Sequence, residues 1–453
     1  MITGTDNCGL RYAVRKGGSS VGWCALSIRC GTRDEGDFHG GIAHFTEHTL
    51  FKGTAHKSAA VVNGYLDRLG GELNAFTTKE EIVLHATVLK EDLPKAAGLL
   101  FELATQASFP EKEVETEKGV VIDEIQSYKD SPADEVYDRF EEMLFEGHAL
   151  GRPILGKPAS VRRITSDELR RFVREHFTPD RMAFTMMADL DEARMEREVR
   201  RLAARYFSAA SGSGISYASS SETETETPPE NCATLGNIRG GDPSLLGGGP
   251  AKQDVFRGVS PRSEGQVKTA IFDRTIDKRN HEVNAVIGGP APSLYEEKER
   301  IAAVLLANIL GGPASNSILN NILREKNGWV YGVECGYTQY RDTGIMAVSL
   351  GCDKDNLGKC FAAIDKATRE LQDKQLSDRK LKAAKKQLLG QLAIASDSGE
   401  AQCLSMGKSL LAFGRVASSA ENKAAIEAVT AAELQAMARR IFDPANLSRL
   451  IYL

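Results

Sequence analysis

The sequence predicts an α+β protein made of two homologous domains, each a mixed, mainly antiparallel sheet with helices packed on it. Three observations lead to this prediction. The chain has 453 residues, which is too many for one compact core. Strand-like stretches alternate with amphipathic helical stretches in both halves. Several sequence features recur at a constant spacing, which indicates a duplicated domain.

The first elements alternate between strand and helix. Residues 21–30 are apolar and partly β-branched, as in a strand buried inside a sheet. A helix is predicted over residues 41–52, and a second one begins after Ser58 and ends at a Gly-Gly pair. A mostly strand stretch and an amphipathic helix follow, at residues 73–89 and 92–106.

The rest of the first domain continues this alternation. Residues 111–129 form a long predicted helix with an apolar stripe along it. Thr165 and Glu168 read as a capping box that begins another helix, which ends near His176. A strand is predicted at residues 181–188. A last helix follows it and ends at about residue 206.

The boundary between the domains falls in a segment of different composition. Residues 208–262 are rich in Ser, Gly, Glu, Thr and Pro, with the run ETETETPP near the middle. Such a segment buries too little apolar surface to fold, so we expect a disordered linker. The predicted domains are residues 1–207, which carry the candidate metal site, and residues 263–453.

The second half repeats the first at one offset. A capping box and the helix end that follows it recur 265 positions later, where Thr165, Glu168, Phe177 and Pro179 become Thr430, Glu433, Phe442 and Pro444. Four matches at one offset indicate that the second domain is a copy of the first.

The candidate chemistry lies in the helix at residues 41–52. His44 and His48 are four residues apart, so both imidazoles leave the same helical face, and Glu47 points into the same region. Two neutral imidazoles on one face are good ligands for a divalent metal of zinc type. A carboxylate beside them that does not bind the metal can take a proton from water. His-x-x-Glu-His is the inverzincin metallopeptidase motif.

The second copy has lost these residues. The positions 265 residues after His44, Glu47 and His48 hold Ile309, Gly312 and Pro313. We therefore expect the metal chemistry in the first domain alone.

Composition narrows the function classes and the compartment. The net charge is −5 and no Lys/Arg-rich run stands out, which argues against a nucleic-acid partner. No apolar run reaches membrane-spanning length and residues 1–18 lack the apolar region of a secretory signal. The eight cysteines form no Cys-x-x-Cys pair, and this pattern predicts reduced thiols. A cytoplasmic location is the expectation, with organellar import after loss of a presequence left open.

With these motifs, the chain resembles the pitrilysin (M16) family of zinc metallopeptidases. It is most similar to the two-domain branch of processing-protease-like enzymes, which includes the catalytic subunit of the mitochondrial processing peptidase. Glu124 lies 76 residues after His48 and seven after Glu117, the spacing of the family's third ligand. The resemblance implies one Zn²⁺ per chain held by His44, His48 and Glu124. It also implies that Glu47 is the base and that Glu117 is a carboxylate behind the ligands.

Two further segments resemble family motifs for substrate binding. Asn74 and Ala75 match the strand beside the active site, to which an extended peptide pairs as an added strand. Arg324 and Tyr331, seven apart, match a pair that binds substrate carbonyls or stabilises the oxyanion. If Arg324 is considered alone, the simpler interpretation is a charged side chain on the surface without a role in substrate binding.

In four-domain relatives the Arg/Tyr pair lies across a closed chamber from the zinc. A chain with two domains forms such a chamber only by pairing with another subunit. We therefore expect a homodimer in which Arg324 and Tyr331 act in trans, with a heterodimer as the alternative.

The predicted function is a zinc-dependent endopeptidase that hydrolyses unfolded or extended peptides in an enclosed chamber. Two alternatives remain open from the sequence. One is a non-catalytic scaffold or partner subunit of a processing complex. The other is a maturation protease dedicated to one peptide precursor.

Overall fold

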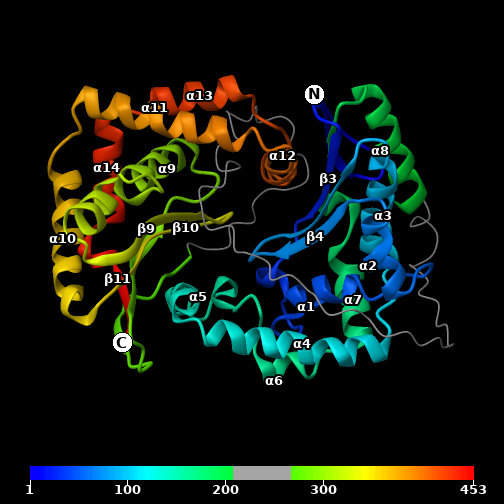
Figure 1. Ribbon diagram of the computed structural model, residues 1–453, viewed down its shortest axis with the longest axis horizontal. Helices are drawn as coiled ribbons and strands as arrows, with labels where there is room; N and C mark the ends of the chain where they lie inside the picture. Colours follow the sequence, from blue (N-terminus) through cyan, green and yellow to red (C-terminus); the bar gives the residue numbers. More distant parts are fainter. Residues whose placement is uncertain (208–266) are drawn as a thin grey trace. The chain divides into compact units, whose positions relative to one another are not determined.

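The structure is a computed structural model that describes residues 1–207 and 267–453. These residues form two compact units (Figure 1). The first contains residues 1–125, 152–207 and 396–416, and the second contains residues 126–151, 267–395 and 417–453. The linker expected at residues 208–262 lies outside the described residues.

The first unit is built on a six-stranded sheet in the order β1-β2-β6-β3-β5-β4. Strands β2 and β6 are parallel, and every other neighbouring pair is antiparallel. This confirms the mixed, mainly antiparallel sheet that the sequence predicts. The strands are β1 (Ile2–Thr5), β2 (Arg11–Lys16), β3 (Val21–Ile28), β4 (Glu72–Thr77), β5 (Ile82–Leu89) and β6 (Met182–Ala188).

Helices cover both faces of this sheet, which explains why β3 and β6 are apolar on both sides. Helices α3 and α8 lie on one side of β3 and α12 lies on the other (Figure 1). The helices of this unit are α1 (Ile42–Leu50), α2 (Ala59–Asp67), α3 (Leu93–Gln106), α4 (Glu111–Lys129, which ends in the second unit), α6 (Pro158–Val161), α7 (Ser166–His176), α8 (Glu192–Phe207) and α12 (Gly399–Phe413).

The second unit repeats the arrangement with five strands in the order β7-β11-β8-β10-β9. Among the described strands of this unit, β7 and β11 are parallel, as β2 and β6 are in the first unit, and the other neighbouring pairs are antiparallel. The strands are β7 (Asp273–Ile276), β8 (Val283–Ala291), β9 (Val330–Gln339), β10 (Gly344–Cys352) and β11 (Ser448–Tyr452). The shared strand order confirms that the two domains are homologous.

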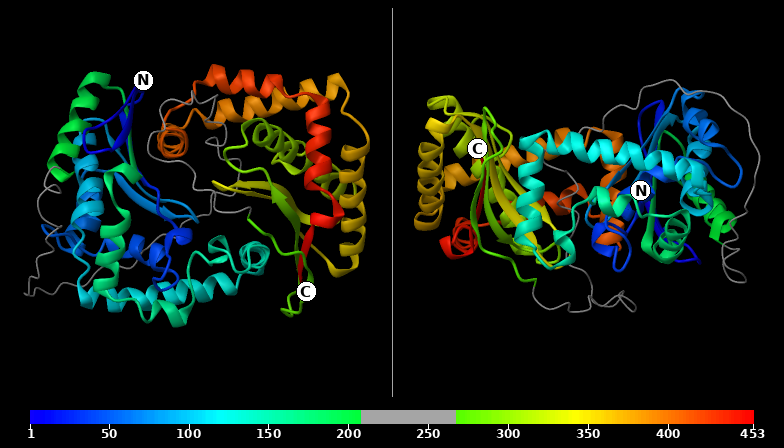
Figure 2. Two further views of the ribbon diagram at one scale, coloured as in Figure 1. Left: turned by 180° about the vertical axis from the view of Figure 1, so that it is seen from behind. Right: turned by 90° about the horizontal axis from the view of Figure 1, so that it is seen from below.

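The helices of the second unit again cover both faces of the sheet (Figure 2). Helices α9, α10 and α14 pack on one face, and α5 packs on the other through Val136, Phe140 and Leu144. The helices are α5 (Pro132–Leu144), α9 (Glu297–Gly311), α10 (Lys354–Asp373), α11 (Asp378–Ala395), α13 (Ser419–Ala428) and α14 (Ala431–Ile441), with a π-helix η6 (Asn320–Lys326). Short 3₁₀ turns are η1 (Thr32–Asp34), η2 (Ala149–Gly151), η3 (Pro179–Arg181) and η7 (Pro444–Asn446).

Each unit takes one covering helix from the other half of the chain. Helix α12 packs on β2, β3 and β6, and His85 of β5 pairs with Glu400 of α12 at 2.8 Å. In the same way α5 packs on β8 and β11. The sequence patterns do not predict this exchange, because an amphipathic helix does not specify which sheet it will cover.

The two predicted capping boxes differ in the structure. Thr430 and Glu433 form the complete box at α14. At α7 the Thr165 hydroxyl accepts from the Glu168 amide, but the Glu168 carboxylate instead accepts from the backbone N–H of His39 and contacts the His39 ring. Glu168 therefore helps to fix the loop that leads into α1.

Candidate metal centre and active site

Helix α1 carries the His-x-x-Glu-His motif and is buried along nearly its whole length. Its N-cap residue is Gly41, which has a φ of 91°. A Cβ at this position would lie 2.8 Å from the Leu155 carbonyl oxygen, so any other residue here would be strained. Oε1 of the Glu35 carboxyl group accepts hydrogen bonds from the amides of Gly41 (2.8 Å) and Ala43 (3.3 Å). These contacts satisfy two free amides at the helix start and fix where the motif begins.

The three predicted metal ligands converge in the first unit. His44 and His48 lie on adjacent turns of α1, with Nε2 atoms 3.8 Å and 3.4 Å from Oε2 of Glu124 on α4. Ligand atoms about 2.0–2.2 Å from a tetrahedral metal lie about 3.3–3.6 Å apart. Within the described residues this is the one group of three or more His, Cys, Asp or Glu side chains with metal-binding geometry. The donor set fits a zinc ion.

The electrostatics of the ligands also suit a cation. Burial lowers the pKa of His44 to about 4, so its imidazole is neutral and can ligate a metal. Burial alone would lower the pKa of His48, but the Glu117 and Glu124 carboxylates outweigh it and raise that pKa to about 10. Burial would raise the pKa of Glu124, and the two imidazoles outweigh it and lower that pKa. The two carboxylates on either side of the His48 ring therefore favour a positive charge at this position, which a bound cation would supply.

Glu117 lies behind His48. It is on the same face of α4 as Glu124, as their spacing of seven residues predicts. Its Oε1 is 2.9 Å from Nδ1 of His48, and its Oε2 is 2.7 Å from Nζ of Lys52. An ionised Glu117 accepts from Nδ1–H, which leaves Nε2 of His48 to face Glu124.

Glu47 points to the same site from α1 and does not belong to the ligand group. Its Oε2 accepts a hydrogen bond of 2.5 Å from the Thr77 hydroxyl at the end of β4. Burial raises the pKa of Glu47, and the Thr77 hydrogen bond opposes this. A raised carboxyl pKa brings the group closer to neutral pH, where a proton acceptor and donor is most effective.

Asn74 and Ala75 lie in β4, the last strand of the first sheet. Strand β4 pairs with β5 on one side, with Asn74 opposite His85, and within the described residues no strand pairs with its other side. An edge strand of this kind can accept an extended peptide.

Arg324 and Tyr331 belong to the second unit. Arg324 is exposed in the π-helix η6, and Tyr331 is 62 % exposed at the start of the edge strand β9. The Tyr331 hydroxyl donates a 2.8 Å hydrogen bond to Asp353, which raises its pKa. The cluster formed by the motif residues of the first unit does not include these two residues.

Two residues that contact the site, Lys52 and Thr77, were not predicted from the sequence. Lys52 follows His48 by four residues, and this helical spacing could have placed it near the site. Thr77 is brought to Glu47 by the position of β4 over α1, and no sequence period signals that contact.

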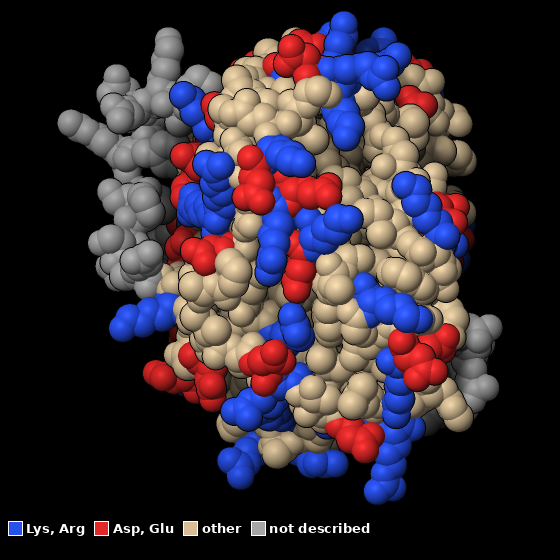
Figure 3. All heavy atoms as spheres, turned by 90° about the vertical axis from the view of Figure 1, so that its left-hand side faces the viewer, with Lys and Arg blue, Asp and Glu red and all other residues tan. Residues whose placement is uncertain are grey.

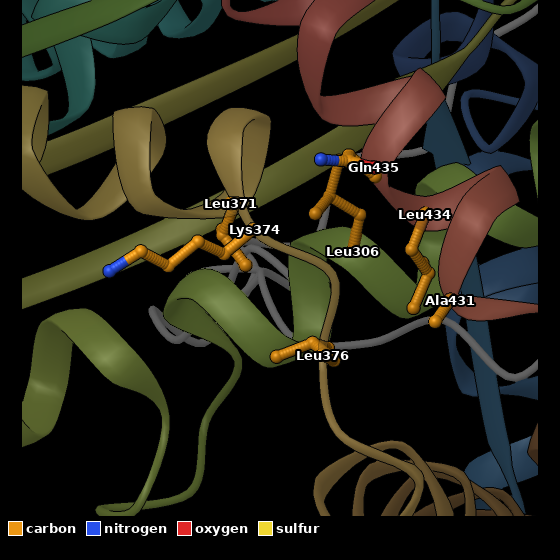
Figure 4. A pocket seen from close by; sticks show the side chains of 7 residues that line it. All are labelled: Leu306, Leu371, Lys374, Leu376, Ala431, Leu434 and Gln435. Carbon is orange, nitrogen blue, oxygen red and sulfur yellow. The ribbon is translucent and has the colours of Figure 1, made fainter.

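Other regions of the described residues give weaker indications of a functional site than the metal centre. A shallow pocket in the second unit is lined by Leu306, Leu371, Lys374, Leu376, Ala431, Leu434 and Gln435, with the Lys374 ammonium directed away from it (Figure 4). This lining has no carboxylate, imidazole or thiol. On the face in Figure 3, basic and acidic side chains are intermingled. Among the helices of the described residues, none combines the length and apolar character needed to cross a membrane.

Comparison with known families decides the identity of the fold. Residues 14–158 match the model of insulinase (peptidase family M16), and residues 163–388 match that of the peptidase M16 inactive domain. The chain belongs to peptidase family M16. The second match agrees with a second domain that lacks the His-x-x-Glu-His motif.

Relatives of this M16 chain carry names that refer to zinc. A Streptomyces coelicolor protein named an uncharacterized zinc protease is 28% identical over 91% of this chain and 80% of its own length. A Bacillus subtilis protein with the same description is 26% identical over 92% of this chain and 89% of its own length.

Two solved structures share the fold. A protease from Helicobacter pylori superposes with a TM-score of 0.78 at 18% identity, covering 100% of this chain and 98% of that one. A peptidase M16 inactive domain from Pseudomonas fluorescens gives a TM-score of 0.77 at 16% identity, with 100% and 97% covered.

Proposed function

We propose that the chain is a zinc-dependent endopeptidase that cleaves unfolded or extended peptides. The observation that carries this proposal is the convergence of His44, His48 and Glu124, with Glu47 beside them but outside the ligand group. Membership of the M16 family and the names of the relatives support it.

The chain's own residues would divide the chemistry as follows. His44, His48 and Glu124 hold one metal ion per chain, and Glu117 keeps Nε2 of His48 in place. A bound zinc supplies a Lewis acid and lowers the pKa of water. Glu47, fixed by Thr77, accepts a proton from the attacking water and returns it to the leaving amine.

The edge strand β4 would hold the substrate. A peptide added beside β4 pairs through backbone groups, so binding depends on an extended conformation more than on one side chain. Asn74 and Ala75 would then contact the substrate backbone close to Glu47, since Thr77 of the same strand reaches that carboxylate. Folded proteins present few such segments, which is why we propose unfolded or extended peptides as substrates.

We further propose that the enzyme is a homodimer in which Arg324 and Tyr331 of one subunit bind substrate at the metal centre of the other. Their exposure in the second unit leaves them available for this role. Mixing subunits tests it. Glu47→Gln and Arg324→Ala chains, each inactive alone, regain activity when mixed if the groups act in trans, and stay inactive if they act in cis.

The proposed activity is tested with an internally quenched peptide. The wild-type chain should cleave it, lose activity with a chelator and regain activity with zinc. Glu47→Gln should bind zinc and fail to cleave, whereas Asp123→Asn, an exposed acidic residue next to Glu124, should behave as wild type. Full activity of Glu47→Gln with zinc bound would show that the proton is carried by another group.

A further inference from the structure

Lys52 lies just beyond the C-terminus of α1 and reaches back to the metal centre. Its side chain is 25% exposed, and its ammonium lies 2.7 Å from Oε2 of Glu117, whose side chain is 6% exposed. The backbone amide of Lys52 bonds to the Thr49 carbonyl, so the residue is tied to the last turn of the motif helix.

The Glu117 carboxylate is held at both oxygens. Lys52 holds Oε2, and Nδ1 of His48 lies 2.9 Å from Oε1. A buried carboxylate without a cation is costly, because burial disfavours the charged form. Lys52 thus holds the Glu117 oxygen that does not face His48, and the other oxygen stays directed at Nδ1 of His48.

The orientation of His48 depends on this chain of contacts. With Nδ1 directed to Glu117, Nε2 lies 3.4 Å from Oε2 of Glu124. His44 differs, since its buried Nδ1 has no hydrogen-bond partner and its ring is enclosed by packing at 7% exposure. Of the two imidazoles, His48 is the one whose Nδ1 is held by a carboxylate.

We propose that Lys52 is a positioning residue of the metal centre, which holds Glu117 so that Glu117 orients His48 toward the metal. This proposal rests on the zinc site of the proposed function. It assigns a role beyond fold stability, because the effect of Lys52 reaches the metal only through Glu117.

The chain offers a matched control. Lys57 pairs with buried Glu102 at 2.5 Å, with side-chain exposures of 20% and 7%, close to those of Lys52 and Glu117. Glu102 contacts Thr54 and not a ligand histidine. Loss of Lys57 therefore removes a similar ion pair without touching the metal centre.

The test measures zinc affinity of the full chain by competition with a chromophoric chelator, without substrate. Groups behind metal ligands typically change metal affinity about 10–100-fold. Lys52→Met should weaken zinc binding about 10-fold, Lys52→Arg should restore most of it, and Lys57→Met should leave it unchanged. In a Glu117→Gln background, Lys52→Met should cause no further loss.

If the wild-type chain binds zinc, two results would overturn the proposal. One is wild-type zinc affinity in Lys52→Met, and the other is a full further loss when Lys52→Met is added to Glu117→Gln. Lys52→Gln replaces Lys52→Met if circular dichroism shows that the latter is unfolded. A wild-type chain that binds no zinc would overturn the proposed function together with this inference, whereas zinc binding that ignores Lys52 would overturn only the inference.

Discussion

Glu35 should be protonated in the folded chain at neutral pH, and Glu35→Gln tests this. The carboxyl is fully buried, and one of its oxygens has no hydrogen-bond partner. Burial raises its pKa from 4.5 to about 8, although the amides of Ala43 and Gly41 and the charge of Arg152 act in the opposite direction. A glutamine has nearly the same shape as the protonated acid, and its amide oxygen can accept the same two backbone hydrogen bonds.

The magnitude follows from proton linkage. Between pH 4.5 and about 8 the unfolded Glu35 has lost its proton and the folded one has kept it, so unfolding releases a proton. The free energy of unfolding of the wild type therefore falls by about 1.4 kcal/mol for each pH unit in this interval, relative to Glu35→Gln. Across the whole interval the variant should gain at most about 5 kcal/mol, and the difference should be constant above pH 8.

Urea unfolding followed by tryptophan fluorescence measures this difference. The chain has two tryptophans, and Trp23 lies in the first unit with Glu35, so a Trp329→Phe background isolates that unit. Glu102→Gln is the control, because both oxygens of Glu102 have partners and its loss should destabilise at pH 7 by about 1–3 kcal/mol. A Glu35→Gln variant that is less stable than wild type at pH 7, with a deficit that grows from pH 4 to 7, would refute the reasoning. The charged form would then be the native one.

Three further predictions concern the ligands, the base and the second unit. Glu124→Gln should weaken zinc binding at least about 100-fold in chelator competition, and Asp123→Asn should not, whereas equal affinities would remove Glu124 from the ligand set. Thr77→Val removes the hydrogen bond that lowers the pKa of Glu47, so the acid limb of the kcat/KM profile should move to higher pH. An unchanged acid limb would mean that Glu47 does not set it. Phe140→Ala empties a fully buried position of α5 and should destabilise the second unit by about 3–5 kcal/mol, measured by urea unfolding with Trp329 as the probe. A loss below 1 kcal/mol would mean that α5 is not an integral part of that unit.

Much of the site was predictable because its residues follow helical spacing. His44, Glu47 and His48 share one face of α1, and Glu117 and Glu124 are seven apart on α4. A period of 3.6 residues is sufficient to place such side chains together. The roles assigned to them stay predictions until the variants are measured.

The contacts between elements were not predictable in the same way. Thr77 meets Glu47 because β4 lies over α1, and α12 covers the first sheet although it is far along the chain. Such pairings depend on tertiary packing, for which a single sequence carries no period. The side chain of Glu168 is a smaller example, since it satisfied the capping-box pattern and yet contacts His39.

The metal centre is tested most directly by anomalous diffraction at the zinc edge from crystals of the zinc-loaded chain. We predict one peak per chain, bounded by Nε2 of His44, Nε2 of His48 and the Glu124 carboxylate. The absence of a peak there, or a peak at other side chains, would contradict the assignment of this site as the catalytic centre.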